Sequence, residues 1–386
     1  MTGPLAGITI VEFAGMGPVP FASMLMADMG ADIIRIDRIP AGKDNSGQRK
    51  NNPMLRGRRS ICLDLTQPSG RDVALRIVAD ADALVEGYRP GKMEKLGLGP
   101  EDCLKRNPAL VYGRMTGWGQ DGPYADLAGH DVNYIALAGA LSLIGRKDAP
   151  PSIPLNLVGD YGGGALFLAL GVLSALLESR TSGLGQVVDA AMIDGASSML
   201  SAFHAMNADG RLSDQRGHNQ LDSGAPHYNV YRTADDKWVS IGAIEPQFYQ
   251  HLRKQLGLDD PIWDDQHDRS LWPEKIVILE KIFRSQSRQQ WCDQMEGLSV
   301  CFAPVLTLDE LPEHPHHVAR ESFVQRDGVD QPAPAPRFSR TSTQLSVPPV
   351  GEGSASADIL TQIGVQPDEI EQLIAQGAVY SVSAKC

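Results

Sequence analysis

Short apolar runs alternate with segments of helical pattern through the first half of the chain, and this alternation constrains the fold more than any other feature. The strand-like runs lie at residues 8–13, 32–37, 60–65, 83–86 and 110–114. Strands that alternate with helices form βαβ units, whose right-handed crossovers produce a mainly parallel sheet. The sequence therefore predicts an α/β fold with a Rossmann-like, parallel-sheet large domain.

The rest of the chain predicts a second, smaller domain. An almost wholly apolar run at 162–180 begins with glycines, and we expect it to form a deeply buried helix of the large domain. After a polar, glycine-rich stretch, strand-like and amphipathic helical pieces resume at residue 228. We predict a large domain at 1–206, a linker at 207–227, a small α+β domain at 228–310, and a return linker and C-terminal segment at 311–386 that packs on the large domain.

The charge of the chain is acidic overall but unevenly distributed. Lys+Arg 35 against Asp+Glu 47 gives a net charge of −12, which argues against a general binder of nucleic acid or of anionic membranes. From 35 to 59, however, eight cations stand beside two acids, so this segment carries +6 and the remainder −18. The cations are Arg35, Arg38, Lys43, Arg49, Lys50, Arg56, Arg58 and Arg59, and the acids are Asp37 and Asp44. A solvated loop is one interpretation, but the segment borders two strand ends, where α/β folds bind ligands, so we expect a compact anion with several phosphates there.

Two features predict a cytoplasmic protein. The five cysteines form no CxxC pair, which is typical of reduced thiols rather than of a disulfide framework. The first residues lack the basic and apolar regions of a signal peptide, and the longest apolar stretch, 165–177, is too short to span a bilayer. We therefore expect neither a membrane nor a nucleic acid as partner.

A glycine-rich turn near the N-terminus has part of the layout of a dinucleotide-binding fingerprint. Gly15 and Gly17 follow a strand and precede a helix, and Asp37 ends the next strand, about 20 residues further on. Pro20 stands in place of the third glycine, so the pattern is incomplete. The turn is either a tight strand-to-helix connection or a place where another adenine nucleotide could bind through backbone amides.

Two residues are candidates for acid–base chemistry. His130 precedes an apolar helical run and is either a structural histidine or a proton carrier, since histidine suits proton transfer near neutral pH. Asp160 stands at the start of the apolar helix and is either its N-cap or a catalytic carboxylate. The three glycines at 162–164 would leave amide N–H groups bare beside Asp160, and such amides could stabilise an oxyanion.

Two further acidic sites have simpler interpretations. Glu245 ends a strand before a proline, which is commonly a turn position. The cluster at 313–317 contains one glutamate and three histidines, but Pro315 breaks the helical spacing that a zinc motif needs. We expect no metal site.

Several motifs together resemble the class III CoA-transferase superfamily and, more specifically, its α-methylacyl-CoA racemase branch. The strings GADIIRIDR and GWGQDGP are similar to marks of the superfamily in general. The strings GHDVNY, LNLVGD and GAIEPQFY resemble the racemase branch more specifically. The resemblance runs over nearly the whole chain.

The resemblance implies both a reaction and an assembly. Members of this branch interconvert (R)- and (S)-2-methylacyl-CoA thioesters in fatty acid metabolism by 1,1-proton transfer at the α-carbon, through an enolate. The CoA is part of the substrate, so no separate cofactor is implied. The family also implies an interlocked homodimer, in which each chain threads through its partner.

Site residues follow from the resemblance position by position. His130 and Asp160 match the two acid–base groups, Glu245 matches an acid that approaches from the partner chain, and Asp131 matches another supporting acid. Arg38 matches a residue at the nucleotide phosphates, and Lys95 stands where relatives have arginine. The remaining positions implied for CoA binding are Leu63, Asp64, Leu65 and Thr66 beside the adenosine, Arg89 of EGYRP near the pantetheine, and Gly129 and Tyr134 of GHDVNY.

Two other functions remain open on the sequence. A CoA-transferase of the same fold would use Asp160 as a nucleophile, forming an acyl-enzyme anhydride and then an enzyme–CoA thioester. A non-catalytic acyl-CoA-binding protein would need neither His130 nor Asp160. The histidine in GHDVNY favours proton transfer.

Overall fold

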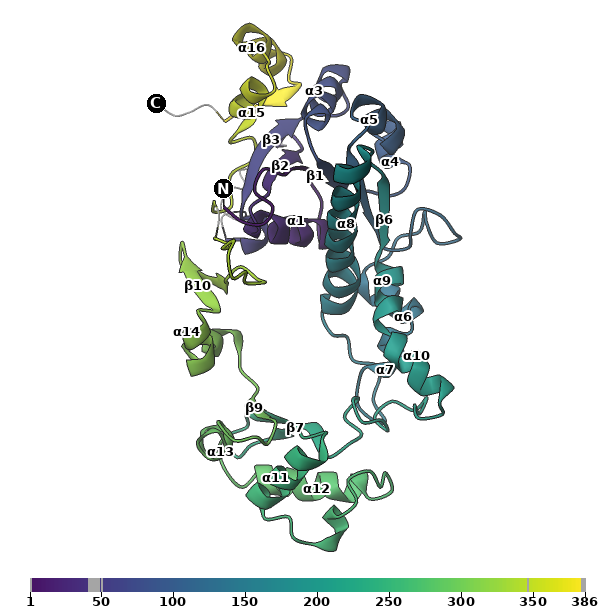
Figure 1. The fold of residues 1–386 in the computed structure, drawn as a ribbon, viewed down its shortest axis with the longest axis vertical. Helices are drawn as coiled ribbons and strands as arrows, with labels where there is room; N and C mark the ends of the chain where they lie inside the picture. The colour runs from purple at the N-terminus through teal and green to yellow at the C-terminus, as the bar shows by residue number, and fades with distance from the viewer. Residues whose placement is uncertain (1, 41–48, 50, 346, 383–386) are drawn as a thin grey trace. The chain divides into compact units, whose positions relative to one another are not determined.

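The computed structural model describes residues 2–40, 49, 51–345 and 347–382, and the chain divides into two compact units (Figure 1). The first unit comprises Met1–Ala138, Leu155–Met199 and His316–Cys386, and the second comprises Gly139–Pro154 and Leu200–Pro315. The chain therefore enters the second unit twice. The domain boundaries expected at 206, 227 and 310 stay a prediction.

The first unit is built on a seven-stranded sheet of order β12-β3-β2-β1-β4-β5-β6. All neighbouring strands are parallel except β12, which pairs antiparallel with β3. The α/β fold with a large parallel sheet is thus confirmed. The strands are β1 (Thr9–Phe13), β2 (Asp32–Asp37), β3 (Arg58–Leu63), β4 (Ala83–Glu86), β5 (Val111–Thr116), β6 (Val187–Ala191) and β12 (Val379–Tyr380).

Helices cover both faces of this sheet. Because successive side chains of a strand point to opposite faces, Val11 and Phe13 of β1 belong to one hydrophobic core and Ile10 to the other. Several of the helices begin with proline, whose missing N–H costs nothing in a first turn. The helices of the first unit are α1 (Pro18–Asp28), η1 (Pro53–Leu55), α3 (Pro68–Ala79), α4 (Lys92–Lys95), α5 (Pro100–Arg106), α6 (Asp131–Leu137), η2 (Leu157–Ala165), α8 (Leu166–Ser182), α9 (Met192–Met199), α15 (Ser356–Gln362) and α16 (Pro367–Ala375).

The C-terminal segment returns to the first unit. Helix α14 (Pro315–Arg320) leads to a hairpin of β10 (Phe323–Arg326) and β11 (Val329–Pro332). Ile359, Leu360 and Val379 then enter the core beneath β3.

The second unit has its own antiparallel sheet and core. Strands β7 (Tyr228–Arg232), β8 (Trp238–Gly242) and β9 (Phe302–Pro304) pair in that order. Tyr231, Val239 and Ile241 alternate along this sheet and pack against the helices. The helices are α7 (Ala140–Leu143), α10 (Ser201–Ala208), α11 (Pro246–Leu256), η3 (Pro261–Trp263), α12 (Trp272–Phe283), α13 (Arg288–Met295) and η4 (Leu308–Glu313).

The long apolar helix differs from the expectation in two ways. It begins at Leu157 rather than at 162, because the π-helical segment η2 runs directly into α8. The resulting helix, Leu157–Ser182, is by length and composition apolar enough to cross a membrane, so the expectation that this run is too short is wrong. A core helix passes the same test, and only one side of this helix is buried: Leu168 and Val172 lie in the core, whereas Leu170 is 63% exposed. The expectation of deep burial is wrong for the other side.

Candidate functional site

The carboxyl ends of the parallel strands gather most of the candidate residues. The strand order reverses between β1 and β4, and α/β folds bind ligands at the carboxyl ends of the strands beside such a reversal. Arg38 follows β2, Asp64 follows β3, and Arg89 comes three residues after the end of β4. These three candidates therefore lie along one edge of the sheet.

Most of the basic segment is not available to a ligand. Arg58 is 2% exposed and donates to Glu12 Oε2 at 2.8 Å, and Arg35 also pairs with Glu12. Three further arginines are paired with carboxylates in the same way. Arg56 binds Asp28 at 2.5 Å, and Arg59 binds Asp32. Arg49 binds both Asp37, at 3.1 Å, and Glu352, at 3.2 Å. Arg35, Arg56 and Arg58 are buried, and a buried cation requires a carboxylate partner. The expectation that this run as a whole binds phosphates is therefore wrong for these five arginines.

Arg38 is the exposed arginine of this segment. Its side chain hydrogen-bonds Tyr88, and this contact and its charge oppose the burial that raises the pKa of the Tyr88 hydroxyl. Arg38 remains the cation best placed for a phosphate among the described members of the segment. Lys43, Asp44 and Lys50 lie outside the described residues.

The turn after β3 is held by its own side chains. The Asp64 carboxylate accepts hydrogen bonds from the Thr66 N–H (2.9 Å), the Thr66 hydroxyl (2.6 Å) and the Gln67 amide (2.9 Å), and these bonds lower the pKa of Asp64. Leu63 is buried, Leu65 is half-buried and Thr66 is exposed. The structure therefore places 63–66 as an ordered strand end rather than as a free loop.

Two other cationic candidates are exposed. Lys95 ends the short helix α4. Arg89 lies near enough to Tyr134 for its charge to oppose the burial that raises the pKa of that hydroxyl.

The start of α6 contacts the first turn of η2, and this contact brings His130, Asp131 and Asp160 together. His130 is the N-cap of α6, and its backbone N–H donates to the Asn133 side chain at 3.1 Å while its imidazole is exposed. Asp131 is 7% exposed, and its Oδ1 accepts the backbone N–H of Asp160 at 2.6 Å. Of the four catalytic candidates, these three share one place in the first unit.

Asp131 is an electrostatically costly carboxylate. Burial raises its pKa, the charge of Asp160 adds to the rise, and the N–H groups of Asp160 and Gly159 oppose it. Its second oxygen, Oδ2, is buried with no hydrogen-bond partner among the described residues. The N–H groups at the start of η2 therefore hold the Asp131 carboxylate in this buried position.

Asp160 lies within η2 rather than before it, which changes the role of the glycines. In a π-helix each N–H bonds the carbonyl five residues back, so the amides of 162–164 are engaged inside the helix. The expectation that they are bare and face an oxyanion is wrong. Instead, a Cβ at Gly163 would lie 2.6 Å from the Ala196 nitrogen, so this glycine permits the close packing of η2 on α9.

Two residues that sequence reasoning missed flank the Asp160 carboxylate. The Asn156 amide donates to Asp160 Oδ2 at 3.0 Å. Gly17, at φ +70°, approaches so closely that a Cβ there would lie 3.1 Å from the same oxygen. The four-residue spacing of Asn156 and Asp160 was a usable signal, whereas the approach of Gly17 depends on the fold.

Gly129 and Tyr134 form a compact aromatic corner with Trp118, which sequence reasoning also missed. The Tyr134 hydroxyl donates to the Gly129 carbonyl, and its ring lies edge-on to Trp118 at 4.7 Å. A Cβ at Gly129 would come within 2.7 Å of the Tyr134 ring, so only glycine fits.

Glu245 belongs to the second unit, where it is the exposed N-cap of α11. The first unit therefore does not itself supply this candidate. Within the described ranges, no group of three or more His, Cys, Asp or Glu side chains could hold a metal ion.

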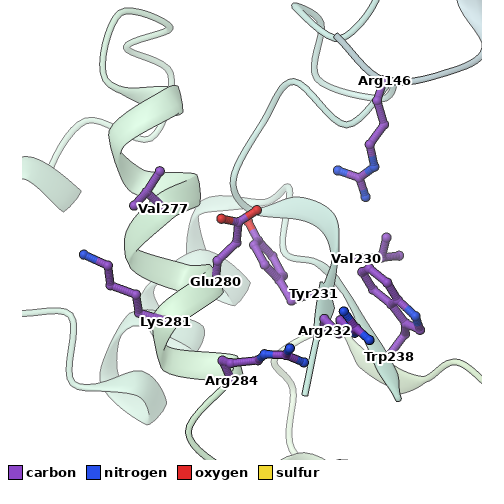
Figure 2. A pocket seen from close by; sticks show the side chains of 9 residues that line it. All are labelled: Arg146, Val230, Tyr231, Arg232, Trp238, Val277, Glu280, Lys281 and Arg284. Atoms are coloured by element: carbon purple, nitrogen blue, oxygen red, sulfur yellow. The ribbon is translucent and has the colours of Figure 1, made fainter. Parts of the chain in front are cut away.

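The second unit also carries an open cavity of about 520 Å³ (Figure 2). Two of its arginines, Arg232 and Arg284, share the exposed carboxylate of Asp236, at 3.1 and 2.7 Å. None of the candidate residues lines it. Its lining consists of Arg146, Val230, Tyr231, Arg232, Trp238, Val277, Glu280, Lys281 and Arg284.

Comparison with solved structures gives the same fold. The chain superposes on a CAIB/BAIF family protein from Brucella suis with a TM-score of 0.81 at 24% identity, over 94% of this chain and 100% of that one. It also matches a hypothetical protein from Mycobacterium tuberculosis with a TM-score of 0.77 at 27% identity, over 93% and 99% of the two chains.

Comparison with known sequences confirms the resemblance seen in the motifs. The chain is 42% identical to the alpha-methylacyl-CoA racemase of Mus musculus and 41% identical to that of Homo sapiens, over 99% of each chain. It is 30% identical to a succinyl-CoA–D-citramalate CoA-transferase of Chloroflexus aurantiacus, over 97% of this chain and 98% of that one. A family model described as CoA-transferase family III matches residues 5–353. Together, the model match and the full-length identities show that this chain belongs to CoA-transferase family III.

Proposed function

We propose that this protein is a racemase that interconverts (R)- and (S)-2-methylacyl-CoA thioesters. The relatives named alpha-methylacyl-CoA racemase match it over nearly their whole length. The observation that carries the proposal is the hydrogen bond between Asp131 Oδ1 and the Asp160 N–H, which joins the helix starts that bear His130 and Asp160.

The reaction assigned to these two residues is a 1,1-proton transfer. One of them removes the α-proton, and the other returns a proton to the opposite face of the planar enolate. Two bases are needed because a single base on one face would tend to restore the same enantiomer. They must rest in opposite protonation states, which suits a carboxylate paired with an imidazolium.

The enolate oxygen needs donors, because an α-C–H beside a thioester is only weakly acidic. The amides of 162–164 cannot serve, since they are engaged inside η2. We assign this role to the N–H groups of Asp131 and Val132, the first two of α6, because a helix leaves such groups without an intrahelical partner, whereas those of Asn133 and Tyr134 bond the His130 carbonyl.

The CoA portion of the substrate is assigned to the same edge of the sheet. Arg38 and Lys95 would pair with the phosphates, and the strand end 63–66 would face the adenosine. Arg89 and the corner of Gly129 and Tyr134 would follow the pantetheine. No cofactor besides the CoA of the substrate is required.

We also propose an interlocked homodimer in which Glu245 of the partner subunit approaches His130. Two observations support it: Glu245 belongs to a different unit from His130, and leucines on one side of α8 are exposed. Sedimentation should give twice 41.7 kDa, and a stable, active monomer of 41.7 kDa would overturn the dimer.

The test of the function is to incubate the protein with (R)- and with (S)-2-methylacyl-CoA in D₂O. Racemisation predicts that both enantiomers approach one mixture and gain deuterium at the α-carbon, without any added acceptor acid. If no α-deuterium enters while CoA passes to an added acid, the CoA-transferase alternative is correct.

Replacing His130 separates the two readings further. His130→Gln should abolish racemisation, because one of the two bases is lost. A transferase that uses Asp160 as nucleophile would retain CoA transfer in the same variant.

A further inference from the structure

The carboxylate that ends β4 is fully buried. Glu86 is 0% exposed, and its Oε2 accepts the backbone N–H of Tyr88 at 2.7 Å while its Oε1 accepts Arg114 Nε at 3.1 Å. Arg114 in turn binds both oxygens of Glu94, at 2.7 and 3.2 Å. Burial raises the pKa of Glu86 to about 7, although the Tyr88 N–H and Arg114 oppose the rise.

An ion pair that serves only stability does not account for this arrangement. Two carboxylates share one arginine, and a buried ion pair is often no more stabilising than apolar residues of the same size. The bond to the Tyr88 N–H belongs to no helix or strand ladder. It shapes the turn 87–89, which follows β4 directly.

This turn lies at the reversal of strand order and reaches toward both halves of the proposed site. The side chain of Tyr88 hydrogen-bonds Arg38, the candidate for the phosphates. The charge of Arg89 lowers the pKa of the Tyr134 hydroxyl, and the charge of Asp160 raises it, so both residues lie near Tyr134. The turn after β4 thus links the end of β2 with the corner beside the acid–base residues.

We propose that Glu86 is a positioning residue, which holds the turn 87–89 so that Tyr88 orients Arg38 and Arg89 faces Tyr134, and which thereby sets the affinity for the CoA moiety. The proposal rests on the proposed function, because the ligand is taken to be a CoA thioester. Glu86 itself touches no reacting atom. Its loss should weaken binding of the substrate and of the transition state alike.

The experiment measures the Kd of CoA itself by calorimetry, together with KM and kcat for the acyl-CoA. Glu86→Gln keeps the size of the side chain but puts an amide where a carboxylate accepts from both Tyr88 and Arg114. We expect the Kd of CoA and the KM to rise about tenfold, with kcat changed by no more than about twofold.

Asp28→Asn is the matched control. Asp28 is also buried and paired with an arginine, Arg56, at 2.5 Å, but it ends α1 before β2 begins, at the opposite edge of the sheet. The Asp28→Asn variant should be destabilised to a similar extent as Glu86→Gln, but its Kd for CoA should be unchanged. An unchanged Kd in Glu86→Gln, or an equal rise in Asp28→Asn, would overturn the proposal.

Tyr88→Phe keeps the test available if Glu86→Gln does not fold, because it leaves Glu86 and its ion pair in place. Removing the hydroxyl that meets Arg38 should raise the Kd of CoA, and a wild-type Kd would contradict the proposed link. In the double variant the two effects should be less than additive, since both act through one turn. If the unaltered protein does not bind CoA, the proposed function fails rather than this inference alone.

Discussion

At the scale of single residues, Asp160 is held from two directions. Asn156, four residues earlier, donates to its Oδ2, and Asp131 accepts its backbone N–H from the neighbouring helix. One contact orients the carboxylate and the other fixes the backbone. This double support suits the catalytic role proposed for Asp160, because small misplacements of a catalytic group cost large factors in rate.

Asp160→Asn should abolish racemisation while leaving CoA affinity intact. The amide keeps the shape of the side chain but cannot accept the α-proton, so inversion should fall by roughly 10²–10⁴-fold, whereas His130 can still exchange the α-proton of one enantiomer. Inversion of (R)- and of (S)-2-methylacyl-CoA in D₂O measures the loss. Asp72→Asn, on the exposed side of α3, is the control and should racemise normally; normal racemisation in Asp160→Asn would remove this residue from the chemistry.

A second prediction concerns His227, which is buried in the second unit at 1% exposure with neither ring nitrogen hydrogen-bonded within the described part of the chain. Burial, together with the charges of His267 and Lys275, lowers its pKa from 6.5 to about 4. The unfolded chain binds this proton first, so the free energy of unfolding should fall by up to about 3 kcal/mol as the pH drops from 6.5 to 4.

His227→Phe should remove this part of the pH dependence. Phenylalanine fits among the rings of Tyr249 and Trp272, which lie 5.7 and 6.0 Å from the histidine, and leaves no polar atom unpaired. Urea unfolding at several pH values, followed by tryptophan fluorescence, compares the two proteins. Parallel pH curves would show that His227 is not the group responsible.

At the scale of elements, the helix formed by η2 and α8 performs different tasks along its length. Its first part carries Asp160 and packs on α9 through Gly163 and Gly195, where a Cβ would collide with backbone atoms. Its second part buries Leu168 and Val172 against the sheet and leaves Leu170 exposed. Segments of π-helix are rare and are frequent at functional sites, which agrees with the position of Asp160.

Leu170→Glu tests whether the exposed side of α8 contacts a partner subunit. Leu170 is 63% exposed, so the change should leave the fold of the chain intact but weaken the proposed dimer, because it would place a charge in an apolar interface. Sedimentation at several concentrations gives the dimer dissociation constant. Leu168→Glu, at a buried position two residues earlier, should instead prevent folding. An unaltered dissociation constant in Leu170→Glu would place the interface elsewhere.

At the scale of the whole molecule, the first unit is completed by residues from both ends of the chain. Strand β12 pairs with β3, with Val379 opposite Leu63 and Tyr380 opposite Cys62. The Asp64 N–H, at the candidate adenosine site, donates to the Ala378 carbonyl at 2.9 Å. The far end of the chain therefore supports the edge at which CoA is proposed to bind.

A matched pair of substitutions, Val379→Asp and Val382→Asp, tests whether the pairing of β12 with β3 stabilises the first unit. Val379 is 2% exposed and Val382 is 50% exposed. The buried aspartate should cost more than about 3 kcal/mol in urea unfolding, and the exposed one about 0.5 kcal/mol or less. Equal effects would mean that β12 contributes nothing to the stability of the first unit.

Much of the architecture could be predicted because it depends on local periodicity. The alternation of apolar runs with helical segments is a property of neighbouring residues, and it is sufficient to indicate a parallel sheet. The predicted strands also indicate where each strand ends, and these ends place Arg38, Asp64 and Arg89 at the carboxyl edge of the sheet. Motifs such as GHDVNY and LNLVGD were sufficient to indicate the family, which the comparisons then confirmed.

The sequence by itself thus determined the fold class and the family, and only the tertiary structure decided which of its charged groups and amides are free. The arginines between 35 and 59 look equivalent along the chain, but five of them pair with carboxylates of other elements, whereas Arg38 has no carboxylate partner among the residues that the structure describes. The glycines at 162–164 look like a bare helix start, but the helix begins earlier and engages their amides. The physical reason is the same in both cases: burial and hydrogen bonding depend on residues distant in sequence, which local pattern does not record.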